Sequence, residues 1–427
     1  MNTHALRHRW FDKWLTAGSP EAQRLVDAAL NIVGQYEEGS RKRKRKPEDD
    51  RRHRIMVEAV AMNLAHTVLM PSDTGHLAVM TGHMQRPRSR YDHPAFGDTF
   101  GNLLTSFASI GWLTFSPSPG MGEASAIAPT SMLKAKVSGI GINLSGIARG
   151  IGEPVILSQK DDASAQGPTR ELVDYPETTM THAFRSDMES LNSFLVGADL
   201  DFMDDNLGMV DLHQRQQRRY FTLKPGATDA TFDRGGRMFG GWWSNLPKTR
   251  RGNIRIEGEP VCILDYSSMF VRLAYALIGK EPPPDDLYAI PGLIGYRRAT
   301  KLIVNCLMFD EYERKRWPKV DRSDHEMPRG LTMPRVRDLI TDHHPDLIPC
   351  FGMGMGHELM MTESTILMEV LKEMKFRGVP GLGLHDGLMA PAPRMTEVRT
   401  MMEVVSRQIT SHTIPVTAEC IPSALVQ

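Results

Sequence analysis

The chain has 427 residues, and its 51 lysines and arginines are balanced by 51 aspartates and glutamates. This length suffices for two or three domains with their own cores, and a net charge of zero means that any nucleic-acid-binding surface must come from local segregation of charge. No apolar run approaches the ~20 residues of a membrane span, and the N-terminal residues lack a signal-peptide core. We therefore expect a globular cytoplasmic protein with no membrane partner.

The four cysteines lie far apart in the chain and include no CxxC pair. This spacing argues against a disulfide framework or a zinc ribbon. It is the spacing expected of a protein in a reducing cytoplasm.

The N-terminal region is predicted to be mostly helical. Helical patterning runs through residues 1–37 and returns over residues 52–70. Between them, residues 41–46 are six consecutive cations, which repel one another. The run predicts either a solvated, mobile link or a functional segment, namely a phosphate-binding arm or a targeting signal.

Residues 97–112 predict another helix, and strands at 113–115 and about 124–133 flank a turn rich in proline and glycine. A helix followed by such a hairpin is typical of a winged helix, which binds duplex DNA with its wing against the backbone. The alternative is a small α/β packing unit with no role in nucleic-acid binding. We assign residues 1–160 to a helical, winged-helix-like region that binds nucleic acid.

The charge of the chain reverses in its middle. Residues 161–206 are acidic and predict a long helix near 181–196, whereas residues 213–255 are rich in arginine, with aromatic residues interleaved. Cations mixed with rings suit the backbone and bases of a nucleic acid, and Arg250 and Arg251 are candidate contacts. The alternative is a basic linker packed by its own aromatics. Residues 161–234 are assigned to a thumb-like helical region and a basic connector.

Two aspartates follow apolar runs that predict buried strands. Asp265 ends the run 261–264, and Asp386 sits at the tip of a hairpin predicted over residues 379–390. A carboxylate in such a place is costly to desolvate without a cation or donor. If the two strands pair, both carboxylates meet at one sheet edge, where divalent cations would neutralise their repulsion.

A helix predicted over residues 296–309 lies between these two strands. Arg297, Lys301, Asn305 and Phe309 share one face of it, and the opposite face is apolar. Two stacked cations could grip adjacent phosphates of one ligand. The alternative is an ordinary half-solvated amphipathic helix. Further helices are predicted over residues 270–278, 332–344 and 359–374.

In this order the segments resemble the family A DNA polymerases. The segment DYSSMFVR at residues 265–272 is similar to motif A, DYSQIELR, and LHDG at 384–387 is similar to motif C, VHDE. Arg297 and Lys301, with Phe309 further along, resemble motif B, RxxxKxxxFxxxY. Upstream, Gly236-Arg237 and residues 245–247 (NLP) resemble the primer-binding segment, and residues 286–288 (DLY) sit where the family has D-I-H. The resemblance covers roughly residues 235–427.

The resemblance implies an α+β fold in which a right-hand polymerase palm, built on an antiparallel sheet, carries helical fingers. The palm would comprise residues 235–275 and 355–427, and the fingers residues 276–354. The implied metal ligands are Asp265, Asp386 and the carbonyl of Tyr266, which would hold two Mg²⁺ ions or, in their place, Mn²⁺. Asp265 and Asp386 are also implied to be catalytic, together with Lys301.

The resemblance also implies binding residues for both substrates, a nucleoside triphosphate and a DNA primer–template or RNA. Contacts to the nucleotide would come from Arg297, Lys301, Phe270, Asn305 and Phe309. Contacts to the nucleic acid would come from Arg237 in the minor groove and from His385 near the primer terminus.

Four positions depart from the family pattern. Gly387 replaces the usual carboxylate of motif C, which phage-type single-subunit RNA polymerases also lack. Phe270 stands at the gate glutamate and Phe309 at the motif B tyrosine, so two apolar rings could pack where the family has a hydrogen bond. Asn305 replaces a motif B aromatic. A bulky Phe270 would crowd a ribose 2′-hydroxyl and favour deoxynucleotides.

Three hypotheses follow from these segments. The first is a minimal family A-like DNA polymerase of a mobile element or phage, without a recognisable exonuclease domain, whose processivity depends on a partner or on the N-terminal region. The second is an RNA polymerase or primase on the same palm. The third is a non-catalytic winged-helix DNA-binding protein with a degenerate palm.

Overall fold

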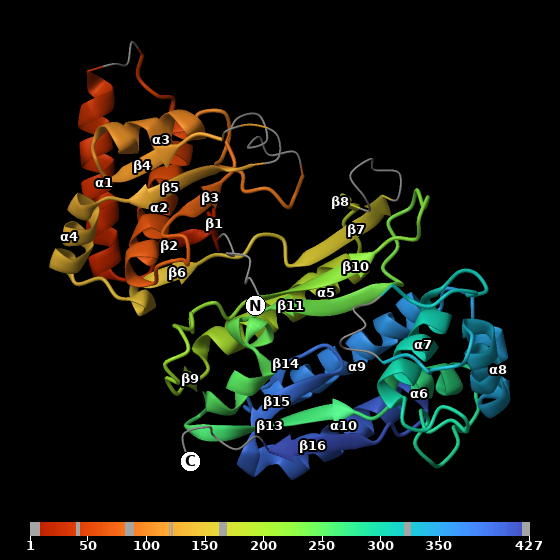
Figure 1. Ribbon diagram of the computed structural model, residues 1–427. Coiled ribbons are helices and arrows are strands. Elements are labelled where there is room, and N and C mark those ends of the chain that lie inside the picture. The colour runs from red at the N-terminus through yellow and green to blue at the C-terminus, as the bar shows by residue number, and fades with distance from the viewer. Residues whose placement is uncertain are drawn as a thin grey trace. The chain divides into compact units, whose positions relative to one another are not determined.

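The computed structural model describes residues 9–39, 43–81, 89–118, 120, 123–161, 169–319 and 326–420. The chain divides into two compact units (Figure 1). The N-terminal unit is Met1–Glu153 with Met209–Gln214, and the C-terminal unit is Pro154–Gly208 with Arg215–Gln427. The first unit ends before the predicted boundary at residue 160 because residues 155–161 form a strand of a sheet in the second unit.

The N-terminal unit combines helices with a sheet in the order β1-β3-β5-β4 and a separate β2–β6 pair. Its elements are β1 (Arg9–Trp10), β2 (Leu15–Ala17), α1 (Pro20–Glu38), α2 (Pro47–Leu69), β3 (Leu77–Val79), α3 (Phe100–Ser109), β4 (Leu113–Ser116), β5 (Ser125–Pro129), α4 (Ser131–Ile140), η2 (Leu144–Gly146) and β6 (Ile147–Arg149).

The prediction of a helix over residues 1–37 is wrong for the described residues before Pro20, where α1 begins. The Ser19 hydroxyl accepts a hydrogen bond from the Ala22 amide at 3.1 Å, and this cap with Pro20 behind it begins α1. The preceding described residues form β1, which pairs with β3, and β2, which pairs with β6. The local hydrophobic periodicity of a segment does not indicate that it will pair with a strand far away in the sequence. Residues 1–8 lie outside the described residues.

The predicted helix and hairpin are present as α3, β4 and β5. β4 and β5 pair antiparallel, and β3 extends the hairpin on the side of β5. Beside them, α1 and α2 form an apolar core with an aromatic cluster that includes Phe11, Phe96 and Phe100. The unit is therefore α+β, and its winged-helix character stays a prediction.

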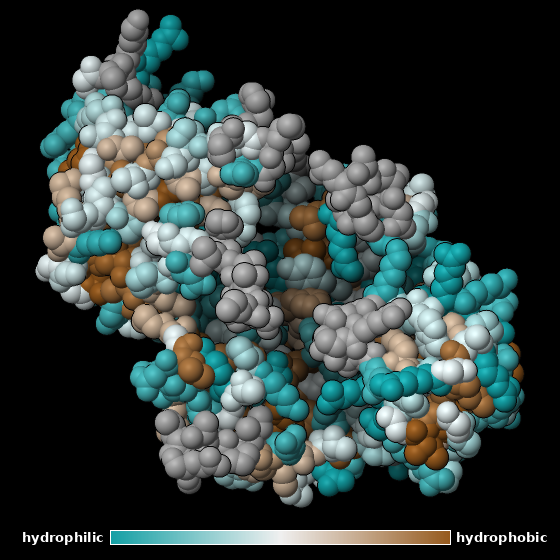
Figure 2. Space-filling model, viewed as in Figure 1, coloured by the Kyte–Doolittle hydropathy of each residue, from teal (hydrophilic) through white to brown (hydrophobic). Residues whose placement is uncertain are grey.

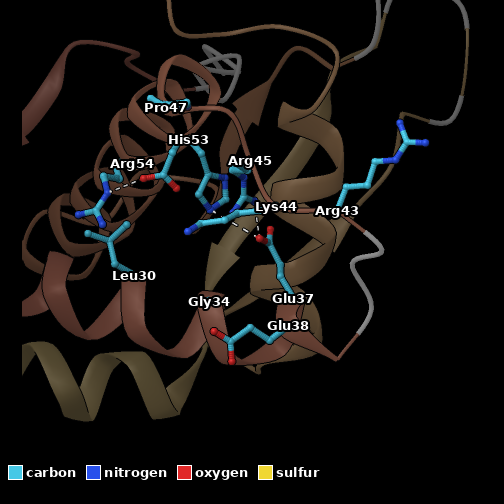
Figure 3. A pocket seen from close by; sticks show the side chains of 11 residues that line it. Leu30, Gly34, Glu37, Glu38, Arg43, Lys44, Arg45, Pro47, His53 and Arg54 are labelled. Atoms are coloured by element: carbon cyan, nitrogen blue, oxygen red, sulfur yellow. Dashed lines mark hydrogen bonds and ion pairs between the residues drawn. The ribbon is translucent and has the colours of Figure 1, made fainter.

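The described part of the basic run lies between two helices. Arg45 forms an ion pair with Glu37 at the end of α1, and both line a pocket together with His53 of α2 (Figure 3). Arg45 is therefore not the freely solvated side chain of a mobile link. Residues 41 and 42 lie outside the described part of the chain.

Helix α2 begins earlier than residue 52, where the sequence pattern places its start. Pro47 occupies its first turn, and Glu48, Asp49 and Asp50 follow. Proline lacks the amide hydrogen that would be unsatisfied there, and acidic side chains interact favourably with the positive end of the helix dipole. Both effects favour a start at Pro47.

The C-terminal unit contains two sheets, in the orders β11-β10-β7-β8 and β14-β15-β13-β12-β9, with β16 also paired to β13. Its elements are β7 (Val155–Asp161), β8 (Thr169–Leu172), α5 (Thr179–Gly197), β9 (Leu200–Phe202), β10 (Gln217–Thr222), β11 (Gly235–Gly240), η3 (Trp242–Asn245), η4 (Lys248–Asn253), β12 (Ile254–Ile256), β13 (Glu259–Tyr266), α6 (Met269–Leu277), α7 (Arg297–Phe309), α8 (Met333–His343), η5 (Pro345–Cys350), α9 (Gly356–Phe376), β14 (Leu382–Gly383), β15 (Gly387–Pro391), η6 (Ala392–Arg394), α10 (Met395–Thr410) and β16 (Val416–Cys420).

The helices predicted after residue 180 are confirmed as α5, α6, α7, α8 and α9, and α6, α7 and α8 gather at one end of the β13 sheet (Figure 1). All pairs in the β13 sheet are antiparallel, whereas β7 and β10 pair in parallel in the other sheet. The α+β class is thus confirmed, with one antiparallel sheet built around β13 and one mixed sheet.

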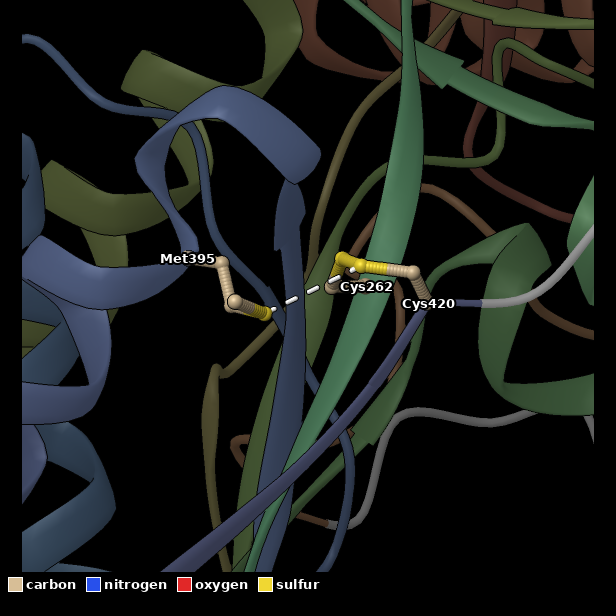
Figure 4. The surroundings of a disulfide bond; sticks show 3 residues. All are labelled: Cys262, Met395 and Cys420. Carbon is tan, nitrogen blue, oxygen red and sulfur yellow. Dashed lines mark hydrogen bonds between the residues drawn. A yellow bond between two sulfur atoms is a disulfide. The ribbon is translucent and has the colours of Figure 1, made fainter.

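A disulfide joins Cys262 of β13 to Cys420 of β16 and corrects the expectation of none (Figure 4). The two cysteines are register partners on antiparallel strands, with Cα atoms 4.0 Å apart. They are 158 residues apart in sequence, so their spacing gave no sign of the pairing. Cys306 and Cys350 are free thiols.

The face of the molecule in Figure 2 is largely hydrophilic, with separate apolar patches. Within the described ranges, none of the helices combines the length and apolar composition needed to cross a membrane.

A buried charge network ties residues 209–214 into the N-terminal unit. The His66 Nε2 atom lies 3.0 Å from Asp211 Oδ2, and Arg9 donates to His66 Nδ1 at 3.2 Å. Because arginine only donates, Nε2 carries the hydrogen that His66 shares with Asp211. Arg149 reaches the same carboxylate at 3.5 Å and also donates to Asp12 at 2.7 Å. Burial acts to raise the pKa of Asp211, but these hydrogen bonds and charges hold it at about 2.

We predict that Asp211→Asn destabilises the N-terminal unit by about 3 kcal/mol, because it removes one charge from a buried network. The wild-type contribution is present above the ordinary aspartate pKa of 3.8 and is lost as the pH falls towards 2. Thermal unfolding as a function of pH measures both effects. Asp27→Asn, at an exposed position of α1, is the control and should leave the midpoint unchanged; equal midpoints for both variants would contradict the prediction.

Candidate active site

Strand β13 carries Asp265 to a point where three strands meet. β13 pairs with β15 on one side and β16 on the other (Figure 1). The register sets Asp265 opposite Gly387 of β15, and the Tyr266 amide lies 3.5 Å from the Asp386 carbonyl oxygen. The strand pairing that was expected only as a condition is present, and it brings Asp265 and Asp386 to the same end of the sheet.

Gly387 is required by this close pairing. A Cβ atom at position 387 would lie 2.4 Å from the carbonyl oxygen of Leu264 and 3.1 Å from Asp265 Oδ1. Any side chain would therefore push β15 away from β13 or displace the carboxylate. The structure thus gives a steric reason for a glycine at position 387.

The Asp265 carboxylate is buried without a full set of partners. Its Oδ1 atom is inaccessible to solvent and has no hydrogen-bond donor among the described residues. Burial and the charge of Asp386 raise the pKa of Asp265 to about 6, against the opposing effects of Lys301 and Lys248. An ionised Asp265 is thus costly here, and a cation would relieve the cost.

Helix α7 presents the predicted cationic face. Ala299, Ile303 and Leu307 are buried on one side, whereas Arg297 and Lys301 are exposed on the other. Lys301 is close enough to Asp265 to lower its pKa. The charge of Lys301 therefore acts on Asp265.

Arg297 and Asn305 of α7 differ in whether their polar atoms have hydrogen-bond partners. Arg297 makes a two-pronged ion pair with Asp286, at 2.6 and 3.1 Å, and its guanidinium lies over the Tyr288 ring. The Oδ1 atom of Asn305 is buried and has no donor among the described residues. Arg297 is held by an exposed carboxylate, and Asn305 offers an unused acceptor.

The two gate positions pack against each other. The rings of Phe270 and Phe309 lie 5.5 Å apart, and the Phe309 ring meets His357 of α9 edge-on at 5.0 Å. Burial and nearby cations, chiefly Arg234, lower the pKa of His357 to about 4. The expected apolar contact is present, and Phe270 is almost fully buried.

Arg237 is held by Glu363, a residue that no sequence motif singled out. Its guanidinium donates to both carboxylate oxygens of Glu363 at 2.9 and 3.0 Å, and it lies 5.6 Å from the Phe270 ring centre. Glu363 is completely buried on the apolar face of α9, four residues after Leu359 and three before Ile366. A charged residue in that pattern was the available signal, because a buried charge needs a partner.

The other predicted residues lie in different settings. His385 is exposed in the β14–β15 turn, with its ring 5.3 Å from that of Phe239. The Tyr266 hydroxyl is buried and donates to the Met402 carbonyl, so its side chain is structural. Arg251 donates to the Leu246 carbonyl at 3.2 Å.

Arg250 is occupied inside the unit. Its guanidinium donates to Asp205 through two bonds of 2.7 Å and to the Gly208 carbonyl at 2.7 Å. These partners occupy the guanidinium that was expected to contact nucleic acid, and the side chains of both Arg250 and Asp205 are nearly buried. Arg250 is therefore a structural residue in this fold.

Comparisons with known proteins add little. No protein-family model matches the chain, and no curated protein matches it. A solved structure described as the POL domain of Pol1 from M. smegmatis, in complex with DNA primer-template and dNTP, aligns with 96% of this chain and 67% of its own. Its sequence identity is 10% and its TM-score is 0.30, which is too low to bear on fold or function.

We predict that lowering the pH stabilises the metal-free C-terminal unit through Asp265. Its folded pKa of about 6 exceeds the ordinary 3.8, so the folded state binds the proton more tightly and stability falls as the pH rises from about 4 to 6. This difference between the folded and unfolded pKa corresponds to about 3 kcal/mol. Thermal unfolding with a chelator should show this slope in the wild type and lose part of it in Asp265→Asn; an unchanged slope would contradict the assignment. Asp342→Asn, at an exposed site on α8, serves as the control.

Proposed function

We propose that this chain is a template-directed nucleotidyltransferase, a minimal family A-like DNA polymerase that joins nucleotides by two-metal-ion phosphoryl transfer. The observation that carries the proposal is the unpartnered buried oxygen of Asp265, set beside Asp386 by strand pairing. A binding protein would have no use for two carboxylates that destabilise each other. An enzyme that binds divalent cations needs such a carboxylate pair, because oxygen ligands suit Mg²⁺ and Mn²⁺.

The residues present fit such cations. Asp265 and Asp386, with the main-chain carbonyl of Tyr266, are the proposed ligands; they supply two carboxylates and a carbonyl, and no group of three or more acidic, histidine or cysteine side chains that could hold a metal occurs here or elsewhere among the described residues. Two bound Mg²⁺ ions would neutralise the carboxylates and stabilise the attacking and leaving oxygens of an in-line displacement at phosphorus.

The chain's own residues would position the nucleotide. Lys301 contacts the triphosphate and is the proposed proton donor to the departing pyrophosphate. Arg297 binds the triphosphate by exchanging its exposed partner Asp286 for a phosphate, which costs little because exposed ion pairs are weak. Phe270 and Phe309 form an apolar wall for the sugar, and Asn305 supplies the unused acceptor next to them. Phosphoryl transfer depends mainly on such positioning and charge neutralisation.

Primer extension on a template with Mg²⁺ tests this function. We expect extension from dNTPs, no detectable extension by Asp265→Ala or Asp386→Ala, and about a hundredfold loss in Lys301→Ala if it acts as the general acid. Asp342→Ala should extend normally. Normal extension by both aspartate variants would reject the site, whereas primer-free synthesis from rNTPs would identify the RNA polymerase or primase alternative.

Sugar selection should depend on Phe270. We predict that Phe270→Ala raises the ratio of rNTP to dNTP incorporation by about tenfold, because removing the ring opens space for a 2′-hydroxyl. Single-nucleotide incorporation with each sugar measures the ratio. Phe376→Ala, at a ring that is 86% exposed, is the control. An unchanged ratio in a folded Phe270→Ala protein would make Phe270 a core residue and not a gate.

A further inference from the structure

The segment Asp286–Tyr288 holds Arg297 from two sides. The Asp286 carboxylate accepts two hydrogen bonds, of 2.6 and 3.1 Å, from the guanidinium, which lies over the Tyr288 ring at 5.4 Å from its centre. The Asp286 side chain is 39% exposed, whereas Tyr288 is almost completely buried. A phosphate can replace the exposed carboxylate, so the Tyr288 ring is the part of this support that a ligand leaves in place.

The position of this segment depends on a tertiary contact. The described stretch between α6 and α7 has no helix or strand that would fix its backbone. The Leu287 carbonyl, between Asp286 and Tyr288, accepts a hydrogen bond of 2.8 Å from Nε2 of His344. His344 follows the last residue of α8 and is 0% exposed. The residue between the two that hold Arg297 is therefore tied to a buried histidine.

His344 is the middle of a directed chain of hydrogen bonds. A carbonyl oxygen only accepts, so Nε2 carries the hydrogen and Nδ1 is an acceptor. The Tyr275 hydroxyl donates to Nδ1 at 3.0 Å. Burial lowers the pKa of His344, and burial together with Asp346 raises the pKa of Tyr275 to about 12, so the imidazole is neutral and the hydroxyl keeps its hydrogen at neutral pH. The chain runs from Tyr275 on α6, the helix that carries Phe270, through His344 to Leu287.

We propose that His344 is a positioning residue for nucleotide binding, which fixes the Leu287 carbonyl and thereby holds the Tyr288 ring where it supports Arg297 against the triphosphate. The inference rests on the proposed function, which assigns the triphosphate to Arg297. Because His344 is inaccessible to solvent, it acts through its neighbours and not by touching the ligand. A contact made equally in the ground state and the transition state changes KM and leaves kcat unchanged.

Primer extension by the full chain at varied dNTP concentration tests the inference. We expect His344→Leu to raise the KM for dNTP about tenfold, the effect of misplacing one contact to a charged group, with kcat and the Kd for primer–template unchanged. His344→Gln should restore most of the affinity, because its amide nitrogen can donate to the Leu287 carbonyl. His182→Leu makes the same substitution at an exposed site on α5 and should leave all three constants unchanged.

A double-mutant cycle with Arg297→Ala supplies a readout that a merely structural role would not move. Arg297→Ala should raise KM by itself, and His344→Leu should raise it no further in that background, because it acts through Arg297. Thermal unfolding shows which variants are folded. If His344→Leu does not fold, Tyr275→Phe takes its place in the cycle. It frees one end of the imidazole and should raise KM about fivefold in the wild type, but not in Arg297→Ala.

The outcomes separate this inference from the function on which it rests. An unchanged KM, independent effects of the two substitutions on KM, or a fall in kcat or in primer–template affinity would overturn the inference alone. Calorimetric titration with dNTP and Mg²⁺ measures nucleotide binding without extension. A wild type that binds dNTP, with the expected loss in the His344 variant, but extends no primer would overturn the proposed catalysis alone. A wild type that binds no dNTP would overturn both.

Discussion

The repulsion between carboxylates at one end of the β13 sheet is the constraint on which the C-terminal unit depends. Strand pairing fixes Asp265 opposite Gly387, next to Asp386, and leaves one oxygen of Asp265 buried without a donor. Glu363 adds a third acidic group from α9. Such an arrangement costs folding free energy, and sites that lower stability in this way are often kept for function.

The cations around this cluster offset its charge in two different ways. Arg297 and Lys301 lie on the exposed face of α7, where Arg297 has an exposed partner in Asp286. An exposed pair is worth little and exchanges easily. Arg237 is instead paired with a fully buried glutamate, and breaking such a pair is costly. The exposed Arg297 pair can therefore exchange partners easily, whereas the buried Glu363 holds the Arg237 guanidinium in place.

Close backbone contacts make this arrangement possible. Gly387 allows β15 to approach β13, and Gly236 allows β11 to lie on α9; a Cβ at either position would meet an atom at 2.4 Å. The apolar contact of Phe270 with Phe309 then closes the space beside Arg237. The disulfide between Cys262 and Cys420 links β16 to the strand that carries Asp265. Packing, and not any single motif, therefore sets the distances between the charged groups.

The sequence by itself determined the elements whose signals are local. The α7 face with Arg297 and Lys301, the Thr332 cap of α8 and the hairpin at Asp386 all follow from periodicity, capping and turn residues within about fifteen positions. The sequence did not show that β13 pairs with β15. It showed only that, if they paired, the carboxylates of Asp265 and Asp386 would meet and would need a cation to neutralise them.

Only the tertiary structure decided which distant groups meet. Register between strands paired Cys262 with Cys420, helix packing set Glu363 against Arg237, and an internal ion pair withdrew Arg250 from the surface. The strands before α1 were likewise set by distant partners. The physical reason is that these contacts join residues tens to hundreds of positions apart. A local hydrophobic pattern sets which face of a strand is buried, but it does not specify which distant segment packs there.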